Sequence, residues 1–453
     1  MIIEKLKHWW RFDAEAEQAS ADNPITPLTD EQRRDTLPLL TMAFGWGFLI
    51  TGLMVGGALG AGVSFWPDLI YVSFLGNITN FVIGSLVGYI GYKTACNSGL
   101  LYKLVYGKIG AYFPVLLLAM VLICWQGIVV GAFGFAWAQD FNSFNFYAVA
   151  IGAGILFTWT TYYGVRGLEL VSAPSVVILV VVGVYAAYTQ ISQAGGMQEF
   201  LELSKVTSAN NPLSNMDAIN IVIGSWIVGA IVMPEYTRFA KKAWVAIAIP
   251  FIVMIIAQWF LQIIGSAGGI VSGQFDFTSY MRLQGVFVAG LGLIGMSLAL
   301  WTTGDANLYL PVIQTSSILC RPQRVMTVIC GVLGTIVGLV IYQHFIQFVD
   351  KLAILLPPLI GPVIAHFYIV KRGDFDIDID IDIEKQDAQP RWNIAALLAY
   401  IVGASSKWWL VQDLLVSSLA GLLISIVAYL IMYYLITAMG ANRKEAIASE
   451  KIN

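Results

Sequence analysis

The hydrophobic positions along the chain form long apolar runs that short polar segments separate. A helix needs about 20 mostly apolar residues to cross a membrane, and twelve runs have roughly that length. The runs lie near residues 37–64, 69–92, 111–138, 146–165, 172–190, 217–236, 244–265, 284–310, 325–343, 347–370, 393–410 and 414–436. By hydropathy the third, eighth and tenth runs are continuous, whereas the first and the sixth are interrupted. The pattern predicts an all-α polytopic membrane protein with 12 transmembrane helices.

The connections between the runs divide the predicted protein into six segments. These are a cytoplasmic N-terminal tail (1–36), a first group of five spans (37–190), a second group of five with its preceding outside loop (191–370), an acidic cytoplasmic loop (371–392), a last pair of spans (393–436) and a cytoplasmic C-terminal tail (437–453). A cleaved signal peptide has a positively charged start, an apolar stretch and a cleavage site with small residues. The first segment lacks this pattern, so we expect it to be retained. In the acidic loop isoleucine alternates with aspartate, which favours a solvated loop or short hairpin, with calcium binding as the alternative.

Composition and charge agree with a membrane location. Hydrophobic residues make up 58% of the 453 residues and charged residues 12%, about half the share of a soluble domain. The net charge of −3 offers no bulk attraction to nucleic acid. If the N-terminus is inside, 21 of the 25 basic residues face the cytoplasm, and the others are Lys205, Arg282, Lys351 and Lys407. Because short cytoplasmic loops accumulate lysine and arginine, we expect a multi-pass protein of the cell (inner) membrane with both termini cytoplasmic.

Glycines interrupt two runs that lie five spans apart. The first run contains TMAFGWGFLITGLMVGGALGAGVSF, and the sixth contains IVIGSWIVGAIVMPEYTRF. Small residues let helices pack closely in lipid, which explains any single glycine. Corresponding interruptions in two halves of a chain are instead typical of inverted repeats, with substrate and ion sites near the middle of the membrane. The spacing favours the second interpretation.

The eighth run places hydroxyls and a carboxylate at membrane depth. Thr302 and Thr303 are adjacent, and Asp305 follows. The threonines can bond back to carbonyls one turn earlier. If they face the interrupted first run, two hydroxyls and the freed carbonyls would supply about five oxygens, a set that suits an alkali cation. Asp305 is expected to set the local charge, to gate the inner end or to form a salt bridge at the helix end.

Two tryptophans lie well inside their runs, away from the membrane interface that tryptophan usually occupies. Trp125 belongs to the third run, and Trp226 lies beside the interruption in the sixth. Two indoles facing one another could stack on the two faces of a flat heterocycle. Ser225 could hydrogen-bond to the polar edge of that ring. Gln126 is a further polar candidate, but one residue along a helix turns it about 100° away from Trp125. The buried polar residues Asn77, Asn80, Gln258 and Gln262 are expected to bond between helices.

The order of these motifs resembles the nucleobase:cation symporter-1 family, in particular its purine and cytosine permease branch. The similarity runs from about residue 37 to 436 and includes MVGGALGAGVSF, GSW before PEYTRF, WTTGDANLY and LLPPLIGPVIAHFYI. The resemblance implies a five-plus-five inverted-repeat fold, shared with the amino acid–sodium symporters, with two additional C-terminal helices. It also implies a sodium site. Its ligands would be the carbonyls of Gly45, Phe48 and Ala299 and the hydroxyls of Thr302 and Thr303.

The resemblance further implies a substrate site. A planar base would stack between Trp125 and Trp226, with Ser225 and Gly229 contacting it. Cytosine permeases have glutamine where this chain has Leu122 and asparagine where it has Ala299. Because a site that hydrogen-bonds its substrate loses affinity when such partners are absent, a hydantoin or a vitamin-precursor pyrimidine is as plausible a substrate as a nucleobase.

The function we expect is secondary active transport by alternating access, with sodium-coupled uptake of a nucleobase or related planar heterocycle. A proton-coupled amino-acid or polyamine carrier on the same fold is the alternative, for which Glu235 is the available carboxylate. A channel or receptor fits paired interruptions less well. The three histidines are scattered and no nucleophile–base pair or metal-ligand spacing appears, so we expect no enzyme activity and no cofactor. No obligate protein partner is evident.

Overall fold

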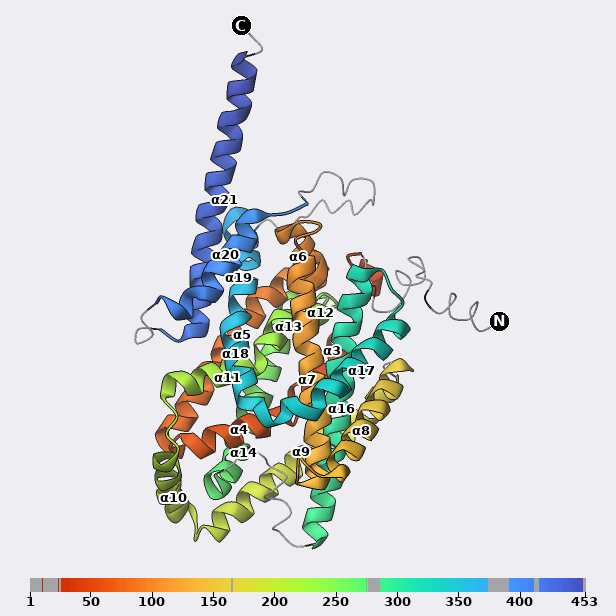
Figure 1. Cartoon of the computed structure of the whole chain (residues 1–453), viewed down its shortest axis with the longest axis vertical. Coiled ribbons are helices and arrows are strands. Elements are labelled where there is room, and N and C mark those ends of the chain that lie inside the picture. Colours follow the sequence, from red (N-terminus) through yellow and green to blue (C-terminus); the bar gives the residue numbers. More distant parts are fainter. Residues whose placement is uncertain are drawn as a thin grey trace, which may run out of the picture.

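The chain is an all-helical bundle, as predicted. The computed structural model describes residues 10, 23, 26–163, 166–273, 275, 286–373, 391–410 and 415–450. Every regular element in these residues is a helix, and the one isolated extended pairing joins Arg34 to Ala240. In Figure 1 the short helix α6 lies near one end of the bundle and α10 at the opposite end, while α21 projects beyond α6.

Most helices follow the predicted runs, whereas α6 and α10 lie in connections between them. Their bounds are α3 (Thr36–Gly47), α4 (Thr51–Gly62), α5 (Ile70–Thr94), α6 (Ser98–Tyr106), α7 (Tyr112–Ala138), α8 (Phe144–Tyr162), α9 (Arg166–Gln193), α10 (Met197–Asn210), α11 (Asn215–Ile231), α12 (Pro234–Thr237), α13 (Ala243–Pro250), α14 (Trp259–Ser272), α16 (Val286–Leu319), α17 (Gln323–Ile341), α18 (Phe345–Leu355), α19 (Pro357–Ala365), α20 (Ile394–Ser405) and α21 (Ser417–Glu450). The wide-turn segment η3 (Phe251–Gln258) joins α13 to α14. Each predicted run coincides with one helix or with consecutive helices.

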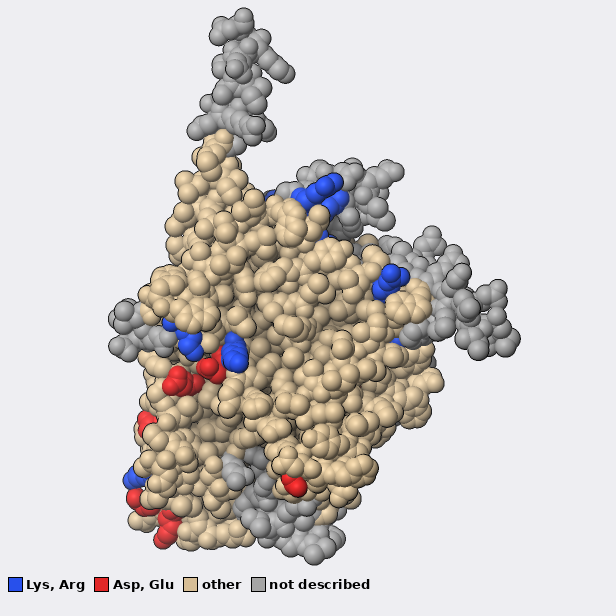
Figure 2. All heavy atoms as spheres, in the orientation of Figure 1, with Lys and Arg blue, Asp and Glu red and all other residues tan. Residues whose placement is uncertain are grey.

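The exact number of membrane spans remains a prediction. Among the described residues, eight helical stretches are long and apolar enough to cross a membrane, or nine when α3 and α4 count as one bent span. Helix α20 has only 12 residues. The surface agrees with a lipid environment, since Ile155 and Trp159 on α8 are 64% and 59% exposed. Figure 2 shows a wide surface with few charged side chains between the two ends.

The predicted interruption of the first span is confirmed. Helix α3 ends at Gly47 and α4 begins at Thr51, with a bend of 42° between them. The sixth span is interrupted as well, because α11 ends at Ile231 and α12 begins at Pro234. Proline has no backbone N–H and therefore cannot continue the helical hydrogen-bond pattern. We refer to the residues between α3 and α4 as the first-span break.

The tenth run is continuous by hydropathy, but the structure divides it into two helices. Helix α18 ends at Leu355 and α19 begins at Pro357. Pro357 and Pro358 both lack the backbone N–H that a helix interior needs, so hydropathy alone could not reveal this break. The eighth run is continuous, as predicted, and forms the 34-residue helix α16.

Most glycines of the first span serve close packing. Helix α4 lies directly against α14, and a methyl group on Gly56 or Gly60 would collide with the backbone carbonyl of Gln262 or Ser266. Conversely, a methyl group on Gly269 of α14 would collide with the carbonyl of Gly57 on α4. Glycines four residues apart on both helices therefore let the two backbones touch, an arrangement common between membrane helices.

Buried amides join neighbouring helices, as expected. The Asn77 amide donates to Gln262 Oε1 at 2.6 Å, which connects α5 to α14. Asn80 donates to the Ile223 carbonyl at 3.1 Å, which connects α5 to α11. Gln258 of η3 donates to the Gly47 carbonyl at 2.6 Å, at the first-span break. These bonds satisfy polar groups that the membrane interior cannot hydrate.

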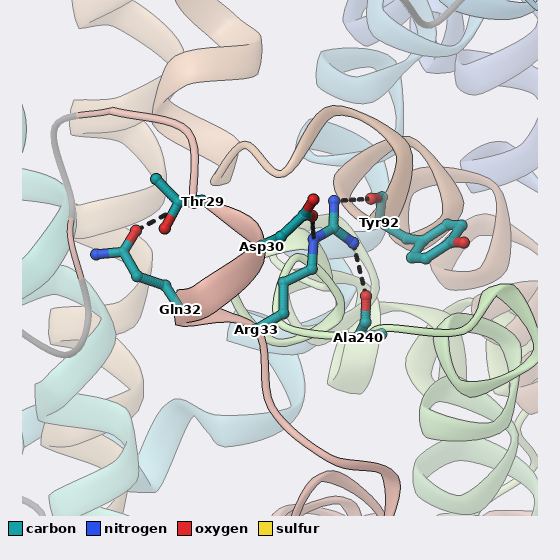
Figure 3. Close-up of polar contacts among 6 residues, drawn as sticks. All are labelled: Thr29, Asp30, Gln32, Arg33, Tyr92 and Ala240. Atoms are coloured by element: carbon teal, nitrogen blue, oxygen red, sulfur yellow. Dashed lines mark hydrogen bonds and ion pairs between the residues drawn. The ribbon is translucent and has the colours of Figure 1, made fainter.

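Part of the predicted N-terminal tail packs against the bundle. The Arg33 guanidinium donates to the carbonyls of Ala240 at 2.7 Å and Tyr92 at 3.1 Å, and pairs with Asp30 at 3.5 Å (Figure 3). Leu28 is buried, and its N–H donates to the Ala95 carbonyl at 3.0 Å. Residues 26–35 therefore connect the end of α5 to the segment that follows α12. The Ile/Asp alternation of the predicted acidic loop lies in 374–390, outside the described residues.

A single added methyl group should disturb the contact between α4 and α14. Gly60→Ala is expected to lower the free energy of unfolding by about 1–3 kcal/mol, because overpacking forces the backbones apart. Unfolding in mixed detergent measures this difference. Gly152→Ala on α8 is the matched control, since nothing lies within 4 Å of the added methyl. Equal stability of the two variants would contradict the packing argument.

Candidate substrate and ion site

A small cavity lies where the first-span break faces α7, α11 and α16. Its volume is about 40 Å³. It is lined by Trp46, Leu49, Thr51, Leu122, Trp125, Ser225, Trp226, Val228, Gly229, Val232, Asn307 and Leu310. Five of the residues predicted to contact substrate are in this set: Leu122, Trp125, Ser225, Trp226 and Gly229. We call this space the central cavity.

The other two predicted substrate residues lie elsewhere. Gln126 is fully buried, and its side chain packs against Gly334 of α17, on another face of α7 from Trp125. This is the direction expected from the 100° turn between neighbouring helical residues. Ala299 is buried on α16, but it is not among the residues that line the central cavity.

The aromatic side chains of the central cavity pack edge to face. Among the ring contacts of the described residues, Trp125 and Trp226 do not meet one another. Trp226 and Trp46 form a T-shaped pair, with ring centroids 5.4 Å apart and planes at 65°. Trp125 packs instead against Phe345 and Phe348, at 6.1 and 5.5 Å. Sequence reasoning missed Trp46, although its position just before the first-span break could have indicated it.

Two N–H donors on cavity-lining residues are buried and have no hydrogen-bond partner among the described residues. They are Trp226 Nε1 and Asn307 Nδ2. An unpaired buried donor costs about 1–3 kcal/mol, so these groups suit a ligand that presents acceptor atoms. Ser225 is already engaged, since its hydroxyl donates to the Val222 carbonyl at 2.7 Å. Asn307 was missed from sequence, but it follows Thr303 by four residues and so shares its helix face.

The first-span break frees two carbonyls at the positions predicted to bind sodium. In a continuous helix the Leu49 and Gly52 amides would donate to Gly45 and Phe48. Here Leu49 N–H donates to Gly47 and Gly52 N–H donates to Leu49, at 3.0 and 3.1 Å. The carbonyls of Gly45 and Phe48 thereby lose their helical partners.

The two predicted hydroxyl ligands bond back to their own helix. Thr302 and Thr303 both donate to the Ala299 carbonyl, at 3.1 and 2.7 Å. This is the local alternative that the sequence left open. A hydroxyl that donates its proton keeps its oxygen lone pairs, so the arrangement leaves both oxygens able to face a cation. Thr303 is fully buried.

Asp305 forms a hydroxyl network rather than a salt bridge with any described residue. Its Oδ1 accepts from Thr160 at 2.6 Å and from Thr161 at 3.2 Å, both on α8. The Trp301 indole donates to the Thr160 hydroxyl at 3.2 Å. The carboxylate is buried and connects α8 to α16 close to the threonine pair. The predicted salt bridge is therefore replaced by neutral donors in this part of the molecule.

The comparisons with known proteins agree on one family. The family model described as a permease for cytosine/purines, uracil, thiamine and allantoin matches residues 27–436. Cytosine permease of Escherichia coli K12 is 27% identical over 435 residues, which cover 95% of this chain and 97% of that protein. Purine-uracil permease NCS1 of Arabidopsis thaliana is 22% identical, covering 86% and 71%.

A solved structure shares the fold. It is a nucleobase-cation-symport-1 family transporter in a closed conformation with bromovinylhydantoin bound. Its TM-score is 0.74 at 19% identity, and the match covers 91% of this chain and 95% of that one. At this identity the likeness establishes the fold alone. It agrees with the inverted-repeat architecture expected from the paired interruptions.

Fold, cavity and family matches together define a multi-pass membrane transporter rather than an enzyme. The chain belongs to the family of permeases for cytosine/purines, uracil, thiamine and allantoin, because the family model matches most of its length. The resemblance found in the sequence is thus confirmed.

The hydrogen bond from Gln258 to Gly47 should stabilise the first-span break. Gln258→Met keeps the side-chain length but removes the donor, so we expect the free energy of unfolding to fall by about 1 kcal/mol. Denaturation in mixed detergent is the measurement. Ile256→Met, two residues earlier and 40% exposed, serves as the control. A Gln258 variant as stable as this control would show that the bond contributes nothing.

Proposed function

We propose that the protein is a sodium-coupled symporter that takes up a planar oxo-heterocycle, such as a nucleobase, a hydantoin or a pyrimidine vitamin precursor. The observation that supports this most directly is the central cavity, whose lining combines tryptophan rings with N–H donors that have no partner among the described residues. Leu49, in the first-span break that frees the Gly45 and Phe48 carbonyls, belongs to the same lining. The family description names cytosine/purines, uracil, thiamine and allantoin, which are heterocycles or contain one.

The proposed substrate follows from the chemistry of the cavity. Leu122, Val228 and Leu310 supply apolar surface, and the indoles of Trp125 and Trp226 supply ring faces and edges. The donors of this lining that have no partner among the described residues are the Trp226 indole N–H and the Asn307 amide N–H. A ring that carries carbonyl oxygens or ring nitrogens would pair with both donors while its faces stay in apolar contact.

The proposed ion site uses five oxygens. Two are the carbonyls of Gly45 and Phe48, which the first-span break frees. The others are the Ala299 carbonyl and the hydroxyls of Thr302 and Thr303, which lie within one helical turn of one another. Because all five oxygens are neutral, a bound sodium ion would keep its full charge, and the membrane potential would contribute about 2.3 kcal/mol per 100 mV to uptake.

The size of the central cavity supports alternating access. A volume of about 40 Å³ is several-fold below the roughly 300–1,000 Å³ of small-molecule pockets, so a heterocycle enters only when the walls move. We propose that helices rock around this central site. The end that carries Arg33, Lys93 and Lys241 would face the cytoplasm of a cell (inner) membrane, as the basic residues of the sequence indicate.

Removing the hydroxyl ligands should weaken sodium binding. Thr302→Ala with Thr303→Ala is expected to raise the sodium concentration for half-maximal uptake by about tenfold or more, because contacts to a charged group contribute about 1.5–3 kcal/mol. Uptake of radiolabelled uracil, cytosine, hypoxanthine and hydantoin into vesicles is the measurement. Thr79→Ala on α5, which removes a hydroxyl that also bonds back to its own helix, is the matched control. Uptake that persists without sodium and follows a pH gradient would favour the proton-coupled carrier.

Removing the indole of Trp226 should weaken substrate binding. Trp226→Ala is expected to raise the substrate Kd by about 5–150-fold, because stacking a base on an aromatic ring contributes about 1–3 kcal/mol. Equilibrium binding in lipid nanodiscs measures the change. Trp159→Ala, on the exposed face of α8, controls for loss of a tryptophan. An unchanged Kd in the Trp226 variant would place the substrate elsewhere.

A further inference from the structure

Trp46 lies where the proposed ion site and the proposed substrate site meet. It is in the last turn of α3, one residue after Gly45 and two before Phe48. Its side chain is 8% exposed and belongs to the lining of the central cavity. The backbone on both sides of Trp46 therefore supplies the freed carbonyls, while its side chain supplies part of the cavity wall.

The indole of Trp46 packs between two rings that belong to the sixth span. Its ring centroid is 5.4 Å from that of Trp226 and 4.2 Å from that of Tyr236. Gly229 makes this packing possible, because a methyl group there would lie 2.6 Å from the Trp226 ring and 3.5 Å from the Trp46 ring. Trp46 consequently contacts the same indole that the proposed substrate would contact.

The residues on the two sides of Trp46 differ in how tightly they are packed. Gly47 is packed tightly, since an added methyl would lie 2.8 Å from Ala257, and its carbonyl accepts from Gln258. Around Gly45, by contrast, nothing lies within 4 Å of where a methyl would be added. A cation that drew the Gly45 and Phe48 carbonyls together would act on the two sides of Trp46 and shift its ring against Trp226.

We propose that Trp46 couples sodium to substrate binding: ordering of residues 45–48 by the cation sets the position of the Trp46 indole against Trp226 and so opens the central cavity to a heterocycle. This inference rests on the proposed function. It makes Trp46 a positioning residue, which acts through Trp226 and the cavity volume. Linkage requires the effect to be reciprocal, so substrate should also tighten sodium binding by the same factor.

The test measures the coupling factor, the ratio of substrate Kd without and with sodium. The probe is whichever of uracil, cytosine, hypoxanthine and hydantoin shows the largest sodium-dependent uptake, and binding is measured in nanodiscs. Coupling between two sites is commonly about 5–150-fold, so we expect wild type in that range and Trp46→Ala below about threefold. Trp46→Phe, which keeps an aromatic ring, should retain an intermediate factor. Trp159→Ala should match wild type.

Trp46→Ala should still bind sodium. Retained sodium binding distinguishes a loss of coupling from a structural defect. In the absence of substrate, sodium should raise the melting temperature of Trp46→Ala as much as that of wild type, because a bound ligand stabilises the folded state by mass action. A Trp46→Ala variant with the full coupling factor would overturn the proposal, and so would one that no longer binds sodium. If Trp46→Ala does not fold, the coupling factor of Trp46→Phe is the deciding measurement. A coupling factor of Trp46→Phe equal to that of wild type overturns the proposal. Failure of every probe to show sodium-dependent uptake by wild type would instead refute the proposed function.

Discussion

A helix inside a membrane can be interrupted only where protein satisfies or encloses the exposed backbone groups, and the rest of this structure depends on that constraint. The first-span break between Gly47 and Thr51 meets it in two ways. The Gly47 carbonyl accepts from the buried Gln258 side chain, and Leu49 and Thr51 line the central cavity. Because lipid offers no hydrogen bonds, such a break persists only at a site that the surrounding helices have already built.

The two halves of the first span are held differently, and the difference places the break. Helix α4 lies against α14 with glycine contacts on both sides, so its backbone has little freedom to shift. Helix α3 packs against η3, where Gly47 meets Val253 and Ala257. Close packing therefore anchors one half of the span, while the other half contributes Trp46 to the cavity lining and carries the freed carbonyls of Gly45 and Phe48.

Two kinds of buried polar group have different physical roles here. The amides of Asn77 and Asn80 donate across helix interfaces and hold the bundle together. The donors of Trp226 and Asn307 have no partner in the described part of the chain, although both residues line the cavity. Paired groups offset their own desolvation, whereas unpaired donors cost free energy that a ligand with acceptor atoms would recover.

The sequence by itself determined the elements that depend on local or linear properties. Apolar run length located all twelve runs on helices, and the paired glycine-rich runs indicated the interruptions near Phe48 and Val232, since these signals require no knowledge of neighbours. Motif order identified the family. Five of the seven predicted substrate residues line the cavity, because tryptophan and serine stand out inside apolar runs.

Tertiary structure decided what depends on neighbours. Gly52, Gly56 and Gly60 serve the contact with α14. Asp305 accepts hydrogen bonds from threonines of α8, and Trp46 rather than Trp125 meets Trp226. Each of these outcomes brings together residues far apart in the chain. A sequence shows which groups need a partner, but only the packing of the helices shows which partner lies within reach.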